Sequence, residues 1–349
     1  MPATAPAATA AGPPPHGAPD VDPSGARTPS AGPSREVARP ARRPSGPAPD
    51  PVRRRAAARR RRRAWATFAL LAGPNVALLL LFVYRPLLES LYLSTLQWNL
   101  GSPVARFVGL GNYREWFTSP ATGQVLTTTA VFTVATVGGA MVLGLALALL
   151  LDRRIPGRGV ARTVAFAPYV LSGLAVGILW LFLFDPRYGL LATVLGWFGL
   201  ASPAWYTAEP WPLVMVVVVY LWKNLGYVAL IYLAGLQAIP QDLKDAAALD
   251  GAGRVRTLRS VVLPLLTPTT FFLLVTMLLS SLQSFDIIQA MTRGGPLGST
   301  TTLMYQIYQE GFVTGRAGYA SAGATVLFVL LLAVTAVQMR FVERKVHYA

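Results

Sequence analysis

The sequence predicts an all-α membrane protein with six transmembrane helices and both termini in the cytoplasm. Hydrophobic residues make up 53% of the 349 residues and charged residues only 13%, so the charges must be concentrated between long uncharged windows. A span needs about 20 predominantly apolar residues to cross roughly 30 Å of hydrocarbon. Only the fourth of the predicted spans contains a charge, that of Lys223. The six windows lie near residues 65–84, 127–151, 163–184, 211–234, 263–285 and 318–339.

The first 63 residues differ in composition from the rest of the chain. They hold 13 arginines, many of them in the run from Arg53 to Arg63, among Pro, Ala, Gly and Ser. Such a segment cannot bury enough apolar surface to offset its ordering entropy, so we expect residues 1–63 to be a disordered cytoplasmic tail. The tail lacks aromatic residues for base stacking, and its basic region is too long for a signal peptide. It therefore indicates neither nucleic-acid binding nor a cleaved leader, and residues 64–349 form the membrane domain.

Lysine and arginine are distributed unequally between the two sides of the predicted spans. If the N-terminus is cytoplasmic, the cytoplasmic segments carry 24 of the 31 basic residues and the external loops carry 6. Without the tail, whose length lowers its weight in such a count, the ratio is still 11 to 6. The positive-inside rule therefore predicts cytoplasmic termini, and it puts the loop between the fourth and fifth spans in the cytoplasm.

No feature of the sequence indicates a catalytic residue or a metal ligand. The chain has no cysteine, and its two histidines, His16 and His347, lie near opposite ends. A membrane-embedded enzyme needs a nucleophile, a metal or an acid–base cluster at bilayer depth, and the predicted spans contain none. An ion-coupled secondary transporter of a small solute is the alternative function. That class usually carries several ionisable residues within its spans, where this chain has only Lys223.

Small residues and prolines within the spans predict a packed bundle rather than a lone anchor. Glycine or alanine recurs at four-residue spacing, which lets helix backbones approach closely in a membrane. We expect these pairs to serve packing within one bundle, although a dimer contact has the same pattern. Prolines bend or start helices. A backbone carbonyl oxygen that loses its helical hydrogen bond at a proline must accept one from a neighbouring helix or from water. The small pairs are Ala140 with Gly144 and Gly173 with Gly177; the prolines are Pro74, Pro168, Pro264 and Pro268.

Residues 240–264, the interspan loop, interrupt the hydrophobic pattern with "PQDLKDAAALDGAGRVRTLRSVVLP". Pro240 suits the first turn of a helix, and Asp242 and Asp245 lie near its N-terminal end, where carboxylates are favoured by roughly 0.3–1 kcal/mol each. Gly251 and Gly253 are expected to end this helix before a second, arginine-bearing one. By itself the pattern fits either a loop on the membrane surface or a docking surface for a soluble partner. One face of the first helix is expected to carry Leu243, Ala246, Ala247 and Asp250.

The interspan loop resembles the "EAA" signature of permease subunits of ATP-binding-cassette (ABC) importers. The pattern is D-A-A, three residues, G, nine residues, V, one residue, L-P, with Asp in place of the usual Glu and Val in place of the usual Ile. The longer stretch "YLAGLQAIPQDLKDAAALDGA" is similar to the sugar-importing branch, which includes the maltose and glycerol-phosphate permeases. The residues that match the signature are Asp245, Ala246, Ala247, Gly251, Val261, Leu263 and Pro264.

Three further segments extend the resemblance, in order, from about residue 65 to the end of the chain. They are "FVGLGNYREWF" at 107–117, "SFDIIQAMTRGGP" at 284–296 and "TTTLMYQIYQEGF" at 300–312. The resemblance implies that the interspan loop, with Asp250 in addition to the matching residues, forms a coupling helix that seats in a cytoplasmic ATPase. It implies a multi-pass protein of a bacterial plasma membrane, with three kinds of protein partner: a second homologous permease, an ABC ATPase dimer and an extracellular solute-binding protein or lipoprotein. The ATPase would bind the ATP, and this chain accordingly has no G-x-x-x-x-G-K-[ST] phosphate loop.

A polar stripe on the fifth predicted span is the candidate solute path. Its hydroxyl and amide side chains recur at three- to four-residue intervals, so they line one helical face, which should be turned toward the bundle interior rather than toward lipid. Neutral groups of this kind can donate to and accept from a polyhydroxylated ligand. They could equally well bond backbone carbonyls or neighbouring helices, and the sequence leaves both alternatives open. The candidates are Thr276, Ser280, Gln283 and Ser284, together with Asn224 and Tyr227 on the fourth span.

Overall fold

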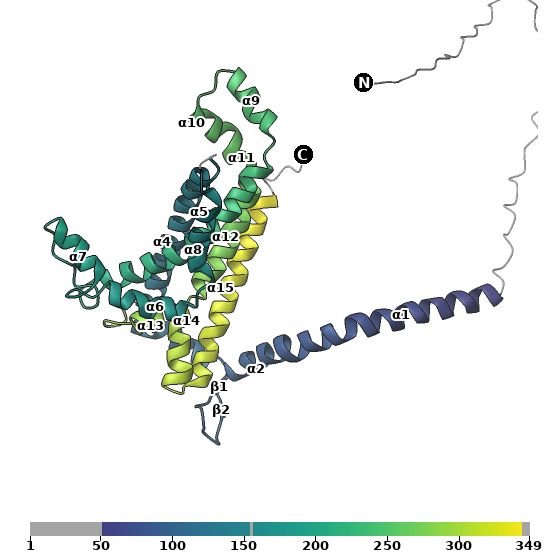
Figure 1. Cartoon of the computed structure of the whole chain (residues 1–349). Helices are drawn as coiled ribbons and strands as arrows, with labels where there is room; N and C mark the ends of the chain where they lie inside the picture. The colour runs from purple at the N-terminus through teal and green to yellow at the C-terminus, as the bar shows by residue number, and fades with distance from the viewer. Residues whose placement is uncertain (1–50, 154–155, 344–349) are drawn as a thin grey trace, which may run out of the picture. The chain divides into compact units, whose positions relative to one another are not determined.

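The computed structural model in Figure 1 describes residues 51–153 and 156–343. The chain divides into two units, Met1–Thr67 and Phe68–Ala349, and the helical bundle belongs to the second. Among the described residues, five helices are long and apolar enough to cross a membrane, and a sixth span results if one bent pair of helices is counted as a single crossing. The protein is therefore a predominantly helical chain with five to six candidate membrane helices.

The first candidate span extends beyond the predicted window at both ends. Helix α1 (Pro51–Leu79) continues through a π-helical turn η1 (Leu80–Tyr84) into α2 (Arg85–Leu93). Residues 51–63, which the sequence analysis assigned to the tail, are thus helical here, because alanine and arginine are strong helix formers directly before an apolar helix. The remainder of the expected tail, residues 1–50, lies outside the described residues.

Four further long helices follow, and three of them form the core of the bundle. They are α4 (Pro120–Leu151), α8 (Trp211–Ala238), α12 (Thr267–Leu282) and α15 (Ala317–Glu343). Gly144 of α4 packs directly on Val228 and Ala229 of α8, so the expected close approach at a small residue is confirmed, and it occurs within one chain. The fully buried side chains of Phe132, Met215 and Leu273 fill the space between α4, α8 and α12.

The third predicted span is not one straight helix. It is broken into α5 (Arg158–Val170) and α6 (Gly173–Leu183), which meet at 103°. Pro168 removes a backbone donor near the end of α5, and Leu171 and Ser172 then adopt extended conformations. A hydropathy window cannot detect such a break because every residue in it remains apolar or small.

The fifth predicted span is also interrupted. A π-helical turn η2 (Leu258–Val262) and a short α11 (Leu263–Leu265) precede α12, and α13 (Asp286–Met291) follows it after three non-helical residues. Pro264 follows η2 just as Pro86 follows η1, since a wider turn relieves the clash between a proline ring and the preceding turn. The remaining elements are β1 (Leu96–Gln97), β2 (Arg106–Phe107), α3 (Gly111–Thr118), α7 (Leu190–Trp197), α9 (Gln241–Leu249), α10 (Arg254–Thr257), α14 (Leu303–Tyr308) and η3 (Gln309–Val313).

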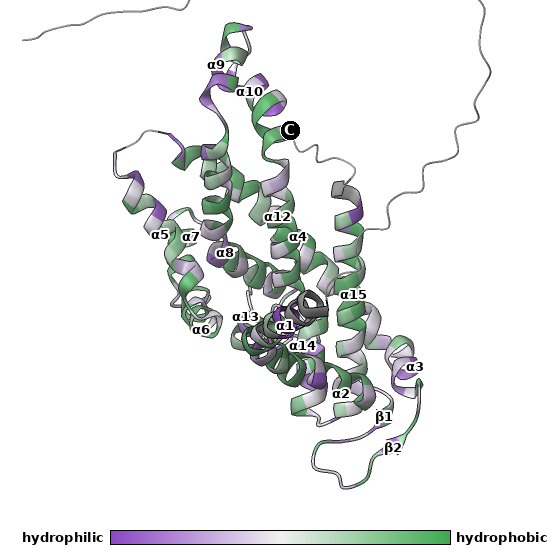
Figure 2. Cartoon of the chain, turned by 90° about the vertical axis from the view of Figure 1, so that its right-hand side faces the viewer, coloured by the Kyte–Doolittle hydropathy of each residue, from purple (hydrophilic) through white to green (hydrophobic). Residues whose placement is uncertain are grey.

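Within the bundle the interspan loop lies at the end opposite to the short helices α6, α13 and α14. In both views α9 and α10 lie beyond one end of α4, α8 and α12, whereas α6, α13 and α14 lie toward the other end (Figures 1 and 2). Figure 2 also shows that the long helices are mainly apolar and that polar residues gather in α9 and α10. Two regions are therefore candidates for a functional site: the interspan loop at one end of the bundle, and the polar side chains that lie between the helices.

Candidate functional site

The interspan loop folds as a helix, a glycine turn and a second helix, as the sequence predicted. Helix α9 begins at Gln241, with Pro240 at its N-cap rather than in its first turn. It ends at Leu249, and Gly251, two residues later, has a φ of +75°, in the left-handed region that favours glycine. The N–H groups of Gly251 and Ala252 donate to the carbonyl oxygens of Ala248 (3.0 Å) and Ala247 (2.9 Å), so two otherwise unpaired carbonyls at the helix end are satisfied.

The surface of α9 is unusually open for a short helix at the end of a bundle. Asp245 and Ala246 are exposed, Ala247 is half-buried, and Leu249 has 89% of its surface accessible. The Asp245 carboxylate accepts a hydrogen bond of 3.0 Å from Gln241 Nε2, one helical turn earlier on α9. Small alanines beside an exposed leucine leave a low apolar surface that another protein can approach closely.

The remaining signature residues connect the loop to the bundle. Asp250 is the C-cap of α9, and Val261 lies half-buried in the π-helical turn. Leu263 and Pro264 are exposed at the start of α11, one short helix before α12. Along the chain, α9 is joined to α8 through Ile239 and Pro240, and to α12 through α10, η2 and α11.

A polar cavity of about 360 Å³ lies between α8, the end of α12 and the start of α13. It contains four of the six predicted path residues, which α8 and the α12–α13 break bring together. Ser280 accepts a hydrogen bond from the Tyr220 hydroxyl at 3.0 Å, and Asn224 donates to the Tyr220 carbonyl at 2.9 Å. The four are Asn224, Ser280, Gln283 and Ser284.

The sequence analysis placed Thr276, Ser280, Gln283 and Ser284 on one helical face, but the structure does not. Helix α12 ends at Leu282, so Gln283 and Ser284 lie in the non-helical break. Ser284 is buried, and its hydroxyl has no hydrogen-bond partner among the described residues. A buried hydroxyl without a partner costs free energy unless a ligand or water completes it.

Two predicted path residues lie outside the polar cavity. The Thr276 hydroxyl donates to the carbonyl oxygens of Phe272 (3.0 Å) and Leu273 (3.1 Å), which is the backbone-bonding alternative that the sequence had left open. Tyr227 stacks on Tyr169 of α5, with ring centres 4.6 Å apart. Both side chains thus have structural partners in the bundle.

The sequence analysis missed two residues with polar side chains in the polar cavity, Tyr220 and Asp286. Tyr220 precedes Asn224 by one helical turn, so helical periodicity could have identified it. Asp286 lies just beyond the predicted fifth span, and its carboxylate packs so tightly on Gly173 of α6 that a Cβ at that glycine would overlap it. Lys223, the one charge that the sequence analysis found inside a predicted span, also lines the cavity and donates to the Tyr169 carbonyl oxygen at 3.1 Å.

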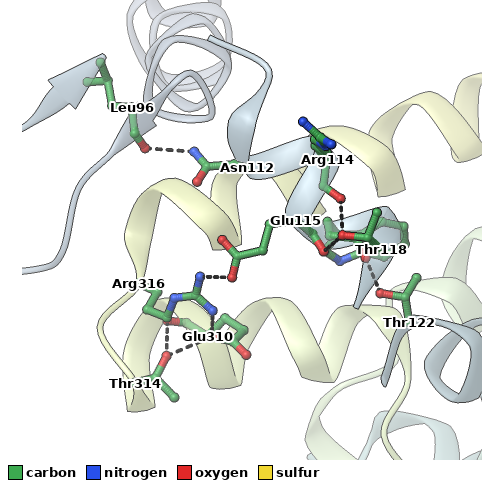
Figure 3. A network of polar contacts seen from close by, with 10 residues as sticks. Leu96, Asn112, Arg114, Glu115, Thr118, Thr122, Glu310, Thr314 and Arg316 are labelled. Carbon is green, nitrogen blue, oxygen red and sulfur yellow. Dashed lines mark hydrogen bonds and ion pairs between the residues drawn. The ribbon is translucent and has the colours of Figure 1, made fainter. Parts of the chain in front are cut away.

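A third polar region ties α3 to the segment before α15 (Figure 3). Arg316 pairs with Glu115 of α3 and, at 3.6 Å, with Glu310 of η3, and its guanidinium lies 4.2 Å from the centre of the Tyr319 ring. Buried Asn112 donates to the carbonyl oxygens of Ser94 (2.8 Å) and Leu96 (2.9 Å). The motif at 107–117 therefore braces the chain after the first span against the start of the last.

We predict that Arg316→Ala lowers the thermal unfolding midpoint of the purified chain in detergent. The change removes two ion pairs and a cation–π contact, together worth about 1–2 kcal/mol at a partly exposed position. Arg85→Ala is the matched control, because it removes only one exposed ion pair, that with Glu89. Equal midpoints for the two variants would show that the Arg316 network does not brace the fold.

The chain matches known transport proteins over most of its length. Residues 140–348 match the family described as "Binding-protein-dependent transport system inner membrane component". The sn-glycerol-3-phosphate transport system permease protein UgpA of Agrobacterium fabrum is 38% identical over 280 residues, which cover 80% of this chain and 95% of that protein. The protein of the same name from Pectobacterium atrosepticum is 36% identical over 290 residues, covering 82% and 97%.

A solved structure has the same fold. A chain in the crystal structure of a bacterial alginate ABC transporter, in complex with an alginate-pentasaccharide-bound periplasmic protein, superposes with a TM-score of 0.72. The match covers 81% of this chain and 96% of that chain at 22% sequence identity, so it bears on the fold alone. The family and the relatives of similar sequence are transport components rather than enzymes, and they support the ABC importer over the ion-coupled carrier. The chain belongs to the family of binding-protein-dependent transport system inner membrane components, the permease subunits of ABC importers.

Proposed function

We propose that this permease lines the path of a sugar or related polyhydroxylated solute and that its interspan loop transmits the motion of a separate ATPase. One observation carries the proposal: the helices that flank the interspan loop, α8 and α12, are the helices whose side chains line the polar cavity. Movement of α9 would therefore act on the cavity walls directly through α8 and, on the other side, through α10, η2 and α11 to α12. This is the arrangement that alternating access between inward-open and outward-open states requires.

The chemistry of the polar cavity favours a solute rich in hydroxyl groups. Asn224, Gln283 and Ser284 present neutral groups that can both donate and accept hydrogen bonds. Such groups can exchange hydrogen bonds with the hydroxyls of a polyhydroxylated ligand, and the two charged residues that also line the cavity, Lys223 and Asp286, are of opposite sign. The glycerol-phosphate permeases among the relatives and the alginate transporter among the solved structures support this solute class.

The proposal includes the partners and the orientation of the chain. A second homologous permease would complete the path, an ABC ATPase dimer would receive α9, and an external binding protein would deliver the solute. The open surface of α9, with exposed Ala246 and Leu249, supports a docked partner at this end. With the loop in the cytoplasm, both termini are cytoplasmic and the protein is a multi-pass component of a bacterial plasma membrane. Residues 64–349 are the permease domain, and we retain residues 1–63 as a separate N-terminal region.

The test is uptake by the assembled importer when the cavity loses its polar groups. Asn224→Leu and Gln283→Leu are expected to raise the half-saturation concentration for uptake or to lower the maximal rate by roughly fivefold to tenfold, about one hydrogen bond each. Assembly with the ATPase, measured by co-purification, should be unchanged. Thr276→Val is the matched control, because that hydroxyl bonds only backbone carbonyls. Wild-type uptake in both leucine variants across the concentration range would exclude this cavity from the solute path.

A further inference from the structure

A second cavity, of about 410 Å³, separates the interspan loop from the ends of α4 and α8. We call it the interfacial cavity. Its apolar part is formed by Leu149 of α4, Leu236 of α8, and Leu258 and Val262 of η2. Leu236 and Val262 are buried, so this part is continuous with the hydrophobic core of the bundle. The cavity lies where apolar helices give way to polar loop, which is the depth of the membrane–water boundary.

Three basic side chains border the interfacial cavity. Arg153 follows the end of α4, Lys244 comes from α9, and Arg254 begins α10. One carboxylate, that of Asp152, also lines the cavity, so three positively charged side chains face one negatively charged side chain. None of the three basic groups forms an ion pair within residues 51–153 and 156–343. Three like charges held around one cavity repel one another unless an anion neutralises them.

The combination of an apolar part and a cationic border selects for an amphiphile. A small free anion would satisfy the basic groups and leave the apolar part in contact with water, whereas a phosphate-bearing lipid satisfies both. The acidic lipids of the cytoplasmic leaflet meet basic residues at this depth, and each such residue near the surface contributes about 1 kcal/mol to lipid binding.

We propose that the interfacial cavity binds an anionic phospholipid of the cytoplasmic leaflet, with its headgroup phosphate between Arg153, Lys244 and Arg254. The glycerol and the first methylenes of an acyl chain lie on Leu149, Leu236 and Leu258. A lipid held there bridges α9 to the ends of α4 and α8, and therefore stiffens the connection between the interspan loop and the spans. The cytoplasmic location rests on the proposed function, but the composition of the cavity does not.

The experiment measures lipid binding by the purified full chain with native mass spectrometry in detergent. Dioleoyl-phosphatidylglycerol, dioleoyl-phosphatidylcholine and inorganic phosphate are the three probes. The test variant carries Arg153→Gln, Lys244→Gln and Arg254→Gln together. The matched control carries Arg106→Gln, Arg114→Gln and Arg187→Gln, three exposed arginines remote from the cavity. Both variants lose the same total charge, so non-specific attraction falls equally.

The wild-type chain and the control should bind phosphatidylglycerol in preference to phosphatidylcholine, and the test variant should bind it roughly tenfold to a hundredfold more weakly. Equal binding by the test variant and the control overturns the proposal. Full displacement of phosphatidylglycerol by millimolar inorganic phosphate also overturns it and indicates a free-anion site. Normal lipid binding by the test variant with lost co-purification of the ATPase would instead assign these residues to a protein contact. Because no arm measures transport, a negative result leaves the proposed function untouched.

Discussion

Replacing Gly251 with proline is expected to abolish solute uptake while leaving the protein inserted in the membrane. The position has a φ of +75°, which proline cannot adopt, and its N–H donates to the Ala248 carbonyl oxygen. The substitution removes that hydrogen bond and redirects the chain between α9 and α10. Because α9 connects to the two helices that line the polar cavity, motion of the ATPase would no longer reach them. Uptake by the assembled importer should fall at least tenfold at unchanged protein level.

The matched control for this experiment is a glycine two residues away. Gly253 has a φ of −67°, and a Cβ built there meets nothing within 4 Å, so Gly253→Ala should transport normally. Asp245→Lys tests the surface of α9 instead of its end. It reverses the charge near the N-terminal half of the helix and breaks the hydrogen bond from Gln241, so we expect lost coupling with intact insertion. Normal uptake in both Gly251→Pro and Asp245→Lys would remove the assignment of α9 as the coupling element.

Gly226→Val is expected to cause the largest loss of folded protein among the substitutions proposed. Gly226 is buried on α8 where α5 crosses it, and a Cβ there would overlap the carbonyl oxygen and carbon of Ala165. Since the obstacle is backbone rather than a flexible side chain, α5 must move away from α8. Overpacking of a membrane core costs about 1–3 kcal/mol when side chains can adjust, and a backbone clash exceeds that range. The thermal midpoint and the yield of monodisperse protein should both fall.

Gly138→Val provides the comparison in the same membrane region. A Cβ at Gly138 of α4 meets nothing within 4 Å, so the substitution adds an apolar side chain to an open surface of this chain. Its midpoint should stay within a few degrees of the wild type. If Gly226→Val melts at the same temperature as Gly138→Val, the close approach of α5 and α8 does not stabilise the bundle.

Long apolar windows and the signature of the interspan loop were readable from the sequence alone. Five long helices lie on predicted windows, because about 20 uncharged residues leave a membrane helix few alternatives. The helix, glycine turn and helix of residues 240–264 follow from local rules: a proline directly before the helix, aspartates in its N-terminal half, and a glycine able to take positive φ after it. The family assignment also came from the loop residues, and the relatives confirm it.

Only the tertiary structure decided which polar residues meet. The break at Leu171–Ser172 lies between Pro168 and Gly173, whereas the break at Gln283–Phe285 contains neither proline nor glycine, and no hydropathy window records either break. Thr276 bonds the backbone of its own helix, whereas Tyr220 and Asp286 line the polar cavity. The interfacial cavity depends likewise on Arg153, Lys244 and Arg254, which come together only when α4 ends beside the interspan loop. Local sequence fixes helices and turns, whereas contacts between distant segments depend on packing across the whole bundle.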